Sequence, residues 1–398
     1  MSSTVSPRTW PLVLIAAIEL GTWSVMPWLF PYFVANGIGL GELSIVLIAT
    51  VAVRIAATVT YGGVLGLRHA RFIMPLGALV ATGVALTLAR STSPALMIAA
   101  LLTAFAMFGC IIPSLYAQIV PESNAYPDSI DTLFARVSAY GAIAGSILGA
   151  AAIKLGGVHL ALLLAATSYG IVAVIGAFYF RHFANKQQSL FQAVEIAPGT
   201  AQHTKRPALA AIVAFTVLVL IFASLRDSLF YYIPFVVADG SAHGYALITL
   251  LTGIYHVSVL VAQIPITQMA RRKNMSFAVC LIFYLLFALI AVASLLFTGL
   301  RPNLLAVIGF CLFISVADAY LFAASELFSR QVSTFRNPHF DGSSLFMGAK
   351  IGGLTLAAWY WVRVPNGATW AHDAIIGLLL LAIFAVPFFY RIKVLRND

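Results

Sequence analysis

Charged residues are scarce in this sequence. Only 9% of its 398 residues are Asp, Glu, Lys or Arg, whereas 61% are hydrophobic and the mean hydropathy is +0.97. Soluble domains carry about 25% charged residues, so this chain could not cover its surface in water. The composition excludes an ordinary soluble protein and predicts an integral membrane protein.

Cysteines and catalytic motifs are also few. The three cysteines (Cys110, Cys280 and Cys311) lie in apolar runs, without the spacing of a zinc site or a disulfide framework. The eight histidines form no HExxH pattern, and the chain has no GxxxxGK[ST] loop. We therefore expect no metal, no cofactor and no enzyme activity, and the missing nucleotide loop argues against an ATP-driven pump.

The net charge of +10 comes from basic residues in short loops between apolar runs. With the N-terminus inside, 15 of the 23 Lys and Arg residues fall on inner segments and only 4 on outer ones. Such an excess is typical of cytoplasmic loops. We expect both termini in the cytoplasm of a bacterial-type inner membrane, and no binding of nucleic acid.

The apolar runs have the length of membrane spans, each of which needs about 20 residues. Twelve spans are predicted, at about 10–35, 42–66, 72–89, 95–120, 133–156, 159–180, 208–237, 244–268, 275–299, 303–328, 341–362 and 371–390. A polar stretch at 181–207 predicts a cytoplasmic linker between bundles at 1–180 and 208–398. The predicted fold is an all-α membrane protein of twelve transmembrane helices.

An internal repeat supports this division. A shift of 203 residues pairs Pro31 with Pro234, Gly37 with Gly240, Gly41 with Gly244, and Arg68 with Arg271. Because each half has an even number of spans, both halves insert with the same orientation. The prediction is two parallel, pseudo-symmetric six-helix bundles about an axis along the membrane normal.

This organisation resembles the Major Facilitator Superfamily. The loop after the second span resembles the family motif G-x-L-A-D-R-x-G-R-R/K, with Leu67 in place of the Asp. The retained residues are Gly63, Leu65, Arg68 and Arg71, and the second half keeps only the basic cluster Arg271, Arg272 and Lys273. The resemblance implies a secondary transporter with a cytoplasmic latch at these residues.

The fifth span carries Gly141, Gly145 and Gly149. This spacing resembles the glycine-rich motif of the family's antiporters, with Ser146 in place of a proline. Close packing of two helices through small residues is the alternative interpretation. The resemblance favours export over import slightly.

Six ionisable residues lie deep in the predicted spans. They are the acids Glu19, Asp227 and Asp318 and the bases Arg54, Arg226 and Lys350. A charge at the bilayer centre is costly, so such residues either form fixed ion pairs or border a wet cavity. Spans 1, 4, 7 and 10 line the cavity in the resembled fold, which favours a functional role for the acids. A partly desolvated carboxylate can take up and release protons near neutrality.

We therefore predict proton coupling by Glu19 or Asp318, with Asp227 and His256 as further candidates, although His256 fits equally well as a neutral histidine bonded between helices. The predicted substrate cavity consists of Arg54, Arg226, Lys350, Trp23, Tyr116, Gln118, Tyr231 and Tyr320. Arg136 and Glu326 are interpreted either as an inner gate or as interfacial residues.

The sequence predicts a monomeric, proton-driven secondary transporter with a small-molecule substrate, protons and the lipid bilayer as its partners. The substrate would be a small polar organic molecule, anionic or zwitterionic, exported as a siderophore, drug or metabolite. An importer of a sugar, organic acid or siderophore is the alternative, and a non-transporting sensor or partner protein is a third.

Overall fold

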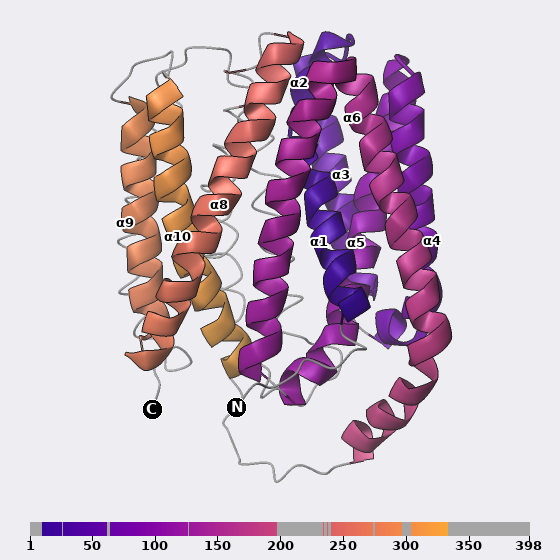
Figure 1. Ribbon diagram of the computed structural model, residues 1–398, viewed down its shortest axis with the longest axis vertical. Helices are drawn as coiled ribbons and strands as arrows, with labels where there is room; N and C mark the ends of the chain where they lie inside the picture. Colours follow the sequence, from indigo (N-terminus) through magenta and orange to yellow (C-terminus); the bar gives the residue numbers. More distant parts are fainter. Residues whose placement is uncertain are drawn as a thin grey trace.

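The computed structural model describes residues 10–25, 27–61, 64–125, 127–196, 234, 237, 240–273, 275–296 and 304–332. Helices form nearly all of this part of the chain, and no strand occurs in it. The helices are α1 (Trp10–Val25), α2 (Leu29–Ala35), α3 (Leu40–Tyr61), α4 (Val64–Arg90), α5 (Pro94–Ala125), α6 (Pro127–Ile196), α8 (Ala242–Arg272), α9 (Phe277–Leu296) and α10 (Leu304–Val332). In Figure 1 they run side by side along the long axis, with α8, α9 and α10 beside the group α1–α6.

Nine of the twelve predicted spans can be compared with these helices. The first corresponds to α1 and α2, the second to fourth to α3, α4 and α5, the fifth and sixth to α6, and the eighth to tenth to α8, α9 and α10. The spans predicted at 341–362 and 371–390 lie outside the described residues, as does the one at 208–237 except for Pro234 and Val237. The all-helical class of the fold is confirmed.

Helix α6 contains two membrane spans joined by a break. Gly156 (φ −143°, ψ 18°) and Gly157 (φ 67°, ψ −166°) leave the helical conformation, and the positive φ of Gly157 favours glycine because it has no Cβ. The break falls between the predicted spans 133–156 and 159–180. We call Pro127–Lys154 the first arm and residues 158–196 the second arm of α6.

Two segments predicted as loops are helical in the structure. Helix α4 begins at Val64, so Arg68 and Arg71 of the resembled loop motif lie in its first turns. The second arm of α6 continues to Ile196, so the first part of the predicted linker 181–207 is helical. Neither segment contains proline, and both are rich in residues that favour helices, such as Ala, Leu, Arg and Gln.

Glycines bring α1 and the first arm of α6 into backbone contact. A Cβ on Gly141 would lie 2.0 Å from the carbonyl oxygen of Ala17, and one on Gly145 would lie 2.0 Å from that of Gly21. One turn further, Gly149 faces Val25, where a Cβ would lie 3.0 Å from its Cα. Since both residue numbers rise together, the two helices are parallel. The structure thus shows the close packing that was one of the two interpretations of these glycines.

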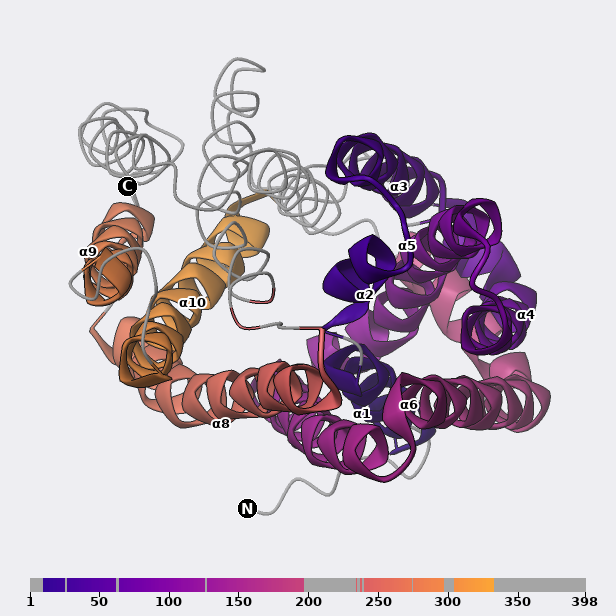
Figure 2. The ribbon, with the colours of Figure 1, turned by 90° about the horizontal axis from the view of Figure 1, so that it is seen from above.

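The same arm of α6 also contacts the second half of the chain. A Cβ on Gly149 would lie 3.2 Å from Cγ2 of Thr249 on α8, and one on Gly253 would lie 3.0 Å from Cβ of Ser146. The numbers run in opposite directions, so α6 and α8 are antiparallel here. Figure 2 shows this arm between α1 and α8. The first arm therefore forms the most extensive described contact between the two halves, and the rings of Trp28 and Tyr245, with centroids 5.9 Å apart, add another.

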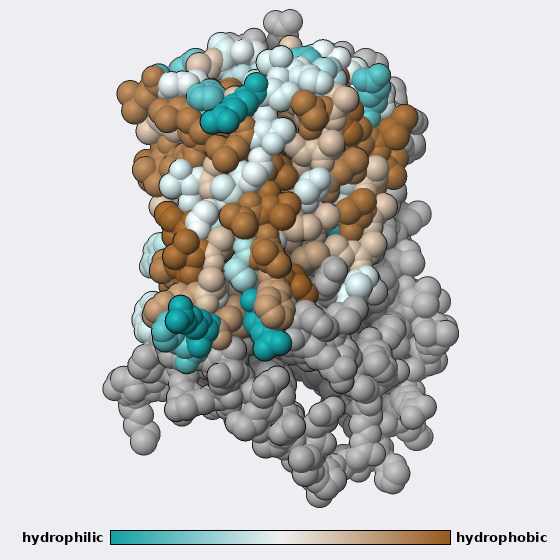
Figure 3. Space-filling view, turned by 90° about the vertical axis from the view of Figure 1, so that its right-hand side faces the viewer, coloured by the Kyte–Doolittle hydropathy of each residue, from teal (hydrophilic) through white to brown (hydrophobic). Residues whose placement is uncertain are grey.

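The outward faces of the helices are apolar over the length of a bilayer core. The segment Arg71–Arg90 on α4 is a 20-residue span of mean hydropathy 2.0, about 30 Å long at 1.5 Å per residue. Leu76 and Leu79 in its middle are more than half exposed. On the face in Figure 3, apolar side chains fill the middle and strongly hydrophilic ones lie near the two ends. Five described segments have the length and composition to cross a membrane.

Candidate functional site

A buried carboxylate lies in the first half of the protein. Glu19 is carried by the apolar helix α1, where only 1% of its surface is exposed. Its Oε1 accepts no hydrogen bond from the part of the chain that the structure describes. The charge of Arg54 on α3 acts on this carboxylate across the bundle. The structure therefore brings together one predicted proton carrier and one predicted cavity base.

A third polar residue of this cluster comes from the second arm of α6. Tyr169 is buried, and the charges of both Glu19 and Arg54 act on its hydroxyl. Within the described residues this hydroxyl has no hydrogen-bond partner. We name Glu19, Arg54 and Tyr169 the N-half cluster. Three helices that are far apart in the sequence thus direct polar groups to one region.

Two phenylalanines of α5 support the N-half cluster. The guanidinium carbon of Arg54 lies 5.9 Å from the ring centroid of Phe105, a cation–π distance. The rings of Phe108 and Tyr169 have centroids 5.7 Å apart, and those of Phe105 and Phe108 are 6.4 Å apart and perpendicular. These ring contacts help to hold the side chains of Arg54 and Tyr169 in place.

A second polar cluster lies in the other half. The hydroxyl of Tyr255 on α8 donates a hydrogen bond to Oδ2 of Asp318 on α10. The charge of Asp318 also acts on His256, whose ring centroid lies 5.0 Å from that of Tyr255. Asp318 and His256 are half-buried. We name Tyr255, His256 and Asp318 the C-half cluster.

Tyr320 points to a different side of α10. Its ring stacks on Phe283 and Phe287 of α9, with centroids 5.0 and 5.8 Å away and interplanar angles of 17° and 13°. Two residues of an α-helix correspond to a rotation of about 200°, so Tyr320 lies nearly opposite Asp318. The structure therefore shows Tyr320 as part of the α9–α10 packing.

The structure places the remaining candidates as follows. Arg136 is exposed near the start of α6, and Arg71 is exposed with its guanidinium carbon 4.7 Å from the centroid of the Phe72 ring. The described helices carry Trp23 (α1), Arg68 (α4), Tyr116 and Gln118 (α5), Arg271 and Arg272 (α8), and Glu326 (α10). The predicted residues outside the described part are Gly63, Arg226, Asp227, Tyr231 and Lys350.

Sequence reasoning missed two members of these clusters, Tyr169 and Tyr255. Both are tyrosines in the middle of apolar spans, away from the membrane interface where tyrosine is enriched. Their position in the middle of a span could have marked both tyrosines as candidate site residues. In the described part of the chain, no three His, Cys, Asp or Glu side chains lie close enough to hold a metal ion.

Comparison of the whole chain with known proteins identifies its fold. No family model and no curated protein sequence matches it. Among solved structures, the nucleoside transporter NupG matches with a TM-score of 0.69 and 13% identity, over 97% of this chain and 99% of that one.

Two further matches come from another group of transporters. A POT family transporter in complex with 5-aminolevulinic acid has a TM-score of 0.72 and 13% identity, over 97% and 96% of the two chains. A variant of the peptide transporter POT in complex with alafosfalin has a TM-score of 0.69 and 14% identity, over 98% and 95%. These three structures are of transporters rather than enzymes, and they confirm the Major Facilitator fold that the sequence resembles.

Proposed function

We propose that this chain, which has the Major Facilitator fold, is a secondary active transporter driven by protons. It carries a small polar organic molecule, anionic or zwitterionic, across the inner membrane by alternating access of its two halves. Export is the favoured direction, on the resemblance of the glycine motif. The observation that carries the proposal is the buried carboxylate of Glu19 opposite Arg54.

A permanent charge at the position of Glu19 would be costly. Glu19 follows the start of α1 by nine residues, which places it about 13 Å into the span, where burial disfavours a charged side chain. Arg54 offsets this cost when the carboxylate is ionised. When Arg54 binds the substrate, it no longer neutralises Glu19. If Glu19 binds a proton at that point, no uncompensated charge is buried at any stage of the transport cycle. Proton binding and substrate binding would then be linked at Arg54.

The C-half cluster contains Asp318, which is the second carboxylate of the proposed mechanism. Asp318 is half-buried, accepts a hydrogen bond from Tyr255, and acts electrostatically on His256. The two clusters lie in different halves, which the first arm of α6 joins where Ser146 and Gly149 contact α8. When the halves rock about this contact, the surroundings of both carboxylates change. This change gives protons access first from one side of the membrane and then from the other.

The solved structures support the class of substrate. They were obtained for transporters of nucleosides and of peptides, one with 5-aminolevulinic acid bound. A base beside an acid, as in the N-half cluster, suits a substrate with a carboxylate, because arginine binds carboxylates with two parallel hydrogen bonds.

Transport in proteoliposomes tests the proposal. The probes are labelled uridine, a labelled dipeptide and labelled 5-aminolevulinic acid, each with the vesicle interior either acidic or alkaline. We expect accumulation of at least one probe in a direction set by the pH gradient. Glu19→Gln and Asp318→Asn should abolish accumulation, whereas Glu19→Gln should retain counterflow, which needs no net proton movement.

Glu42→Gln is the matched control, because Glu42 is an exposed carboxylate of the same half that accepts a hydrogen bond from the Gly39 N–H at 3.3 Å. It should transport like the wild type. Full gradient-driven accumulation in both Glu19→Gln and Asp318→Asn would reject proton coupling at these residues. Binding without flux of any probe would favour a sensor.

A further inference from the structure

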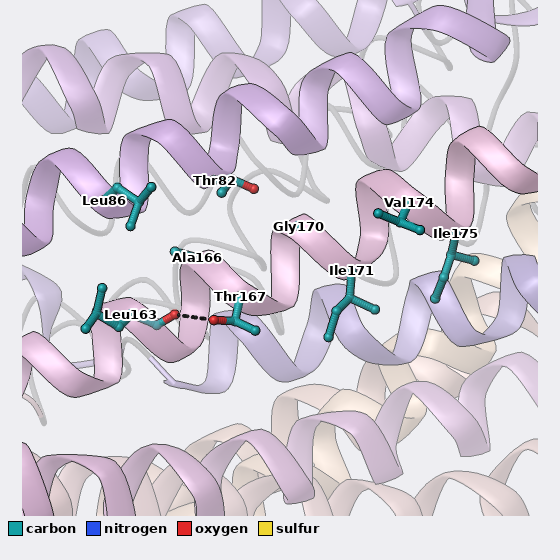
Figure 4. Close-up of a pocket in the computed structure, with 9 residues that line it drawn as sticks. All are labelled: Thr82, Leu86, Leu163, Ala166, Thr167, Gly170, Ile171, Val174 and Ile175. Carbon is teal, nitrogen blue, oxygen red and sulfur yellow. Dashed lines mark hydrogen bonds between the residues drawn. The ribbon is translucent and has the colours of Figure 1, made fainter.

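An apolar groove lies between α4 and the second arm of α6. Its volume is about 660 Å³. Figure 4 shows Leu86 and Leu163 at one end and Val174 and Ile175 at the other, with Gly170 in the floor between them. The lining residues are Thr82, Leu86, Leu163, Ala166, Thr167, Gly170, Ile171, Val174 and Ile175.

The chemistry of the groove suits a hydrocarbon chain. Its only hydroxyls belong to Thr82 and Thr167, which donate to the carbonyl oxygens of Ala78 and Leu163 on their own helices, at 3.0 and 2.9 Å. Both hydroxyls therefore already have a hydrogen-bond acceptor, and the groove offers a ligand mainly apolar contacts. Val174 is 70% exposed, so the groove opens outward from the bundle, where the surrounding solvent is lipid rather than water.

The groove has a defined direction because α4 and α6 are antiparallel here. At one end, His159 Nδ1 lies 2.8 Å from the carbonyl oxygen of Ala89. At the other, a Cβ on Gly176 would lie 3.8 Å from Cα of Pro75. The residues Leu163 to Ile175 cover about 18 Å along the helix, which matches the greater part of an acyl chain in one leaflet.

Two basic residues, Arg90 and Lys154, lie toward the Leu86 end of the groove. Arg90 is the last residue of α4, one turn beyond Leu86, and its side chain is exposed. Lys154, also exposed, ends the first arm of α6 just before the Gly156–Gly157 break, and His159 follows that break. No described acidic residue lies in the segments 82–93 and 150–175 that form this end. The hydrocarbon groove therefore ends at a cationic site at the membrane interface.

We propose that this groove binds one molecule of an anionic phospholipid, with an acyl chain along α6 and the phosphate group at Arg90 and Lys154. Charge complementarity selects the lipid class, since the negative phosphate is attracted to both cations and arginine can bind a phosphate with two parallel hydrogen bonds. The acyl chain of the lipid would fill the groove between the two helices. None of the lining residues belongs to the N-half or C-half cluster.

Native mass spectrometry of the purified chain tests the proposal, with phosphatidylglycerol and phosphatidylcholine as the two probes. Gly170→Phe should weaken phosphatidylglycerol binding about tenfold, because Gly170 lines the groove and an added Cβ would face Thr82 Oγ1, at 4.0 Å, on its other wall. Gly83→Phe is the matched control. Its Cβ would meet nothing within 4 Å, it does not line the groove, and it should bind lipid like the wild type.

A double variant, Arg90→Gln with Lys154→Gln, tests the head-group site without filling the groove. Both residues are exposed, so this variant should fold normally. It should bind the two lipids equally, whereas the wild type should prefer phosphatidylglycerol about tenfold. Equal binding of both lipids by the wild type, or unchanged phosphatidylglycerol binding in Gly170→Phe, would overturn the proposal.

Discussion

Replacement of Gly145 by alanine tests how α1 and α6 are held together. The added Cβ would lie 2.0 Å from the carbonyl oxygen of Gly21, whereas ordinary contact begins at 3.4 Å. The two helices must therefore separate by more than 1 Å, and backbone atoms cannot move aside as a flexible side chain can. Overpacking of this kind costs about 1–3 kcal/mol, while the gain in helix propensity from Gly to Ala returns about 0.5–1 kcal/mol.

The clash is with backbone atoms, which places the overpacking cost at the upper end of its range, so we expect Gly145→Ala to lower the free energy of unfolding by about 2–2.5 kcal/mol. Gly83→Ala on α4 is the control, because a Cβ there meets nothing within 4 Å; it should be neutral or stabilise by up to about 1 kcal/mol. The assay is reversible unfolding in mixed detergent micelles, followed by tryptophan fluorescence. Equal stability of Gly145→Ala and the wild type would refute the packing between Gly145 and Gly21.

Three further predictions concern the polar clusters. Arg54→Leu should lower the stability of the protein by clearly less than the roughly 3–5 kcal/mol of a broken buried ion pair, because a buried carboxyl that loses its counter-charge takes up a proton. The double variant with Glu19→Gln should recover part of this loss in the same unfolding assay, and additive effects would contradict the pair. Tyr255→Phe should cost about 0.5–1.5 kcal/mol, since the hydrogen bond from the Tyr255 hydroxyl to Asp318 is lost; an unchanged unfolding midpoint would count against that bond. Tyr169→Phe keeps the packed ring, so the free energy of unfolding should change by less than about 1 kcal/mol. The midpoint of the pH dependence of uptake should shift, because the hydroxyl near Glu19 is lost. An unchanged midpoint would show that this hydroxyl takes no part in proton coupling.

Much of the fold could be predicted from the pattern of apolar runs. A span must present about 20 apolar residues to lipid, and this requirement is visible in any single sequence. The boundary between the predicted spans 133–156 and 159–180 coincides with the break inside α6. The ends of α4 and α6 were predicted less well, because a helix can continue into water wherever the residues favour it, and hydropathy does not report that continuation.

The candidate site could be predicted only in part, because the partners of a charge depend on tertiary packing. Glu19, Arg54, Asp318 and His256 stood out as ionisable residues in apolar spans. Tyr169 did not, since its role depends on the second arm of α6 crossing near α1 and α3. The close approach of α1 to α6 could not be predicted from the sequence, because the spacing of the glycines fits both helix packing and a transport motif.

Proton movement coupled to substrate tests the central claim most directly. The pH-sensitive dye pyranine is sealed in proteoliposomes without an imposed gradient, and a probe found to be transported is added outside. We predict that the wild type changes the internal pH when the substrate is added and that Glu19→Gln causes no pH change, although Glu19→Gln still exchanges labelled for unlabelled substrate in vesicles preloaded with that substrate. A substrate-dependent pH change in Glu19→Gln equal to that of the wild type, or none in the wild type, would contradict the claim that Glu19 carries the coupled proton.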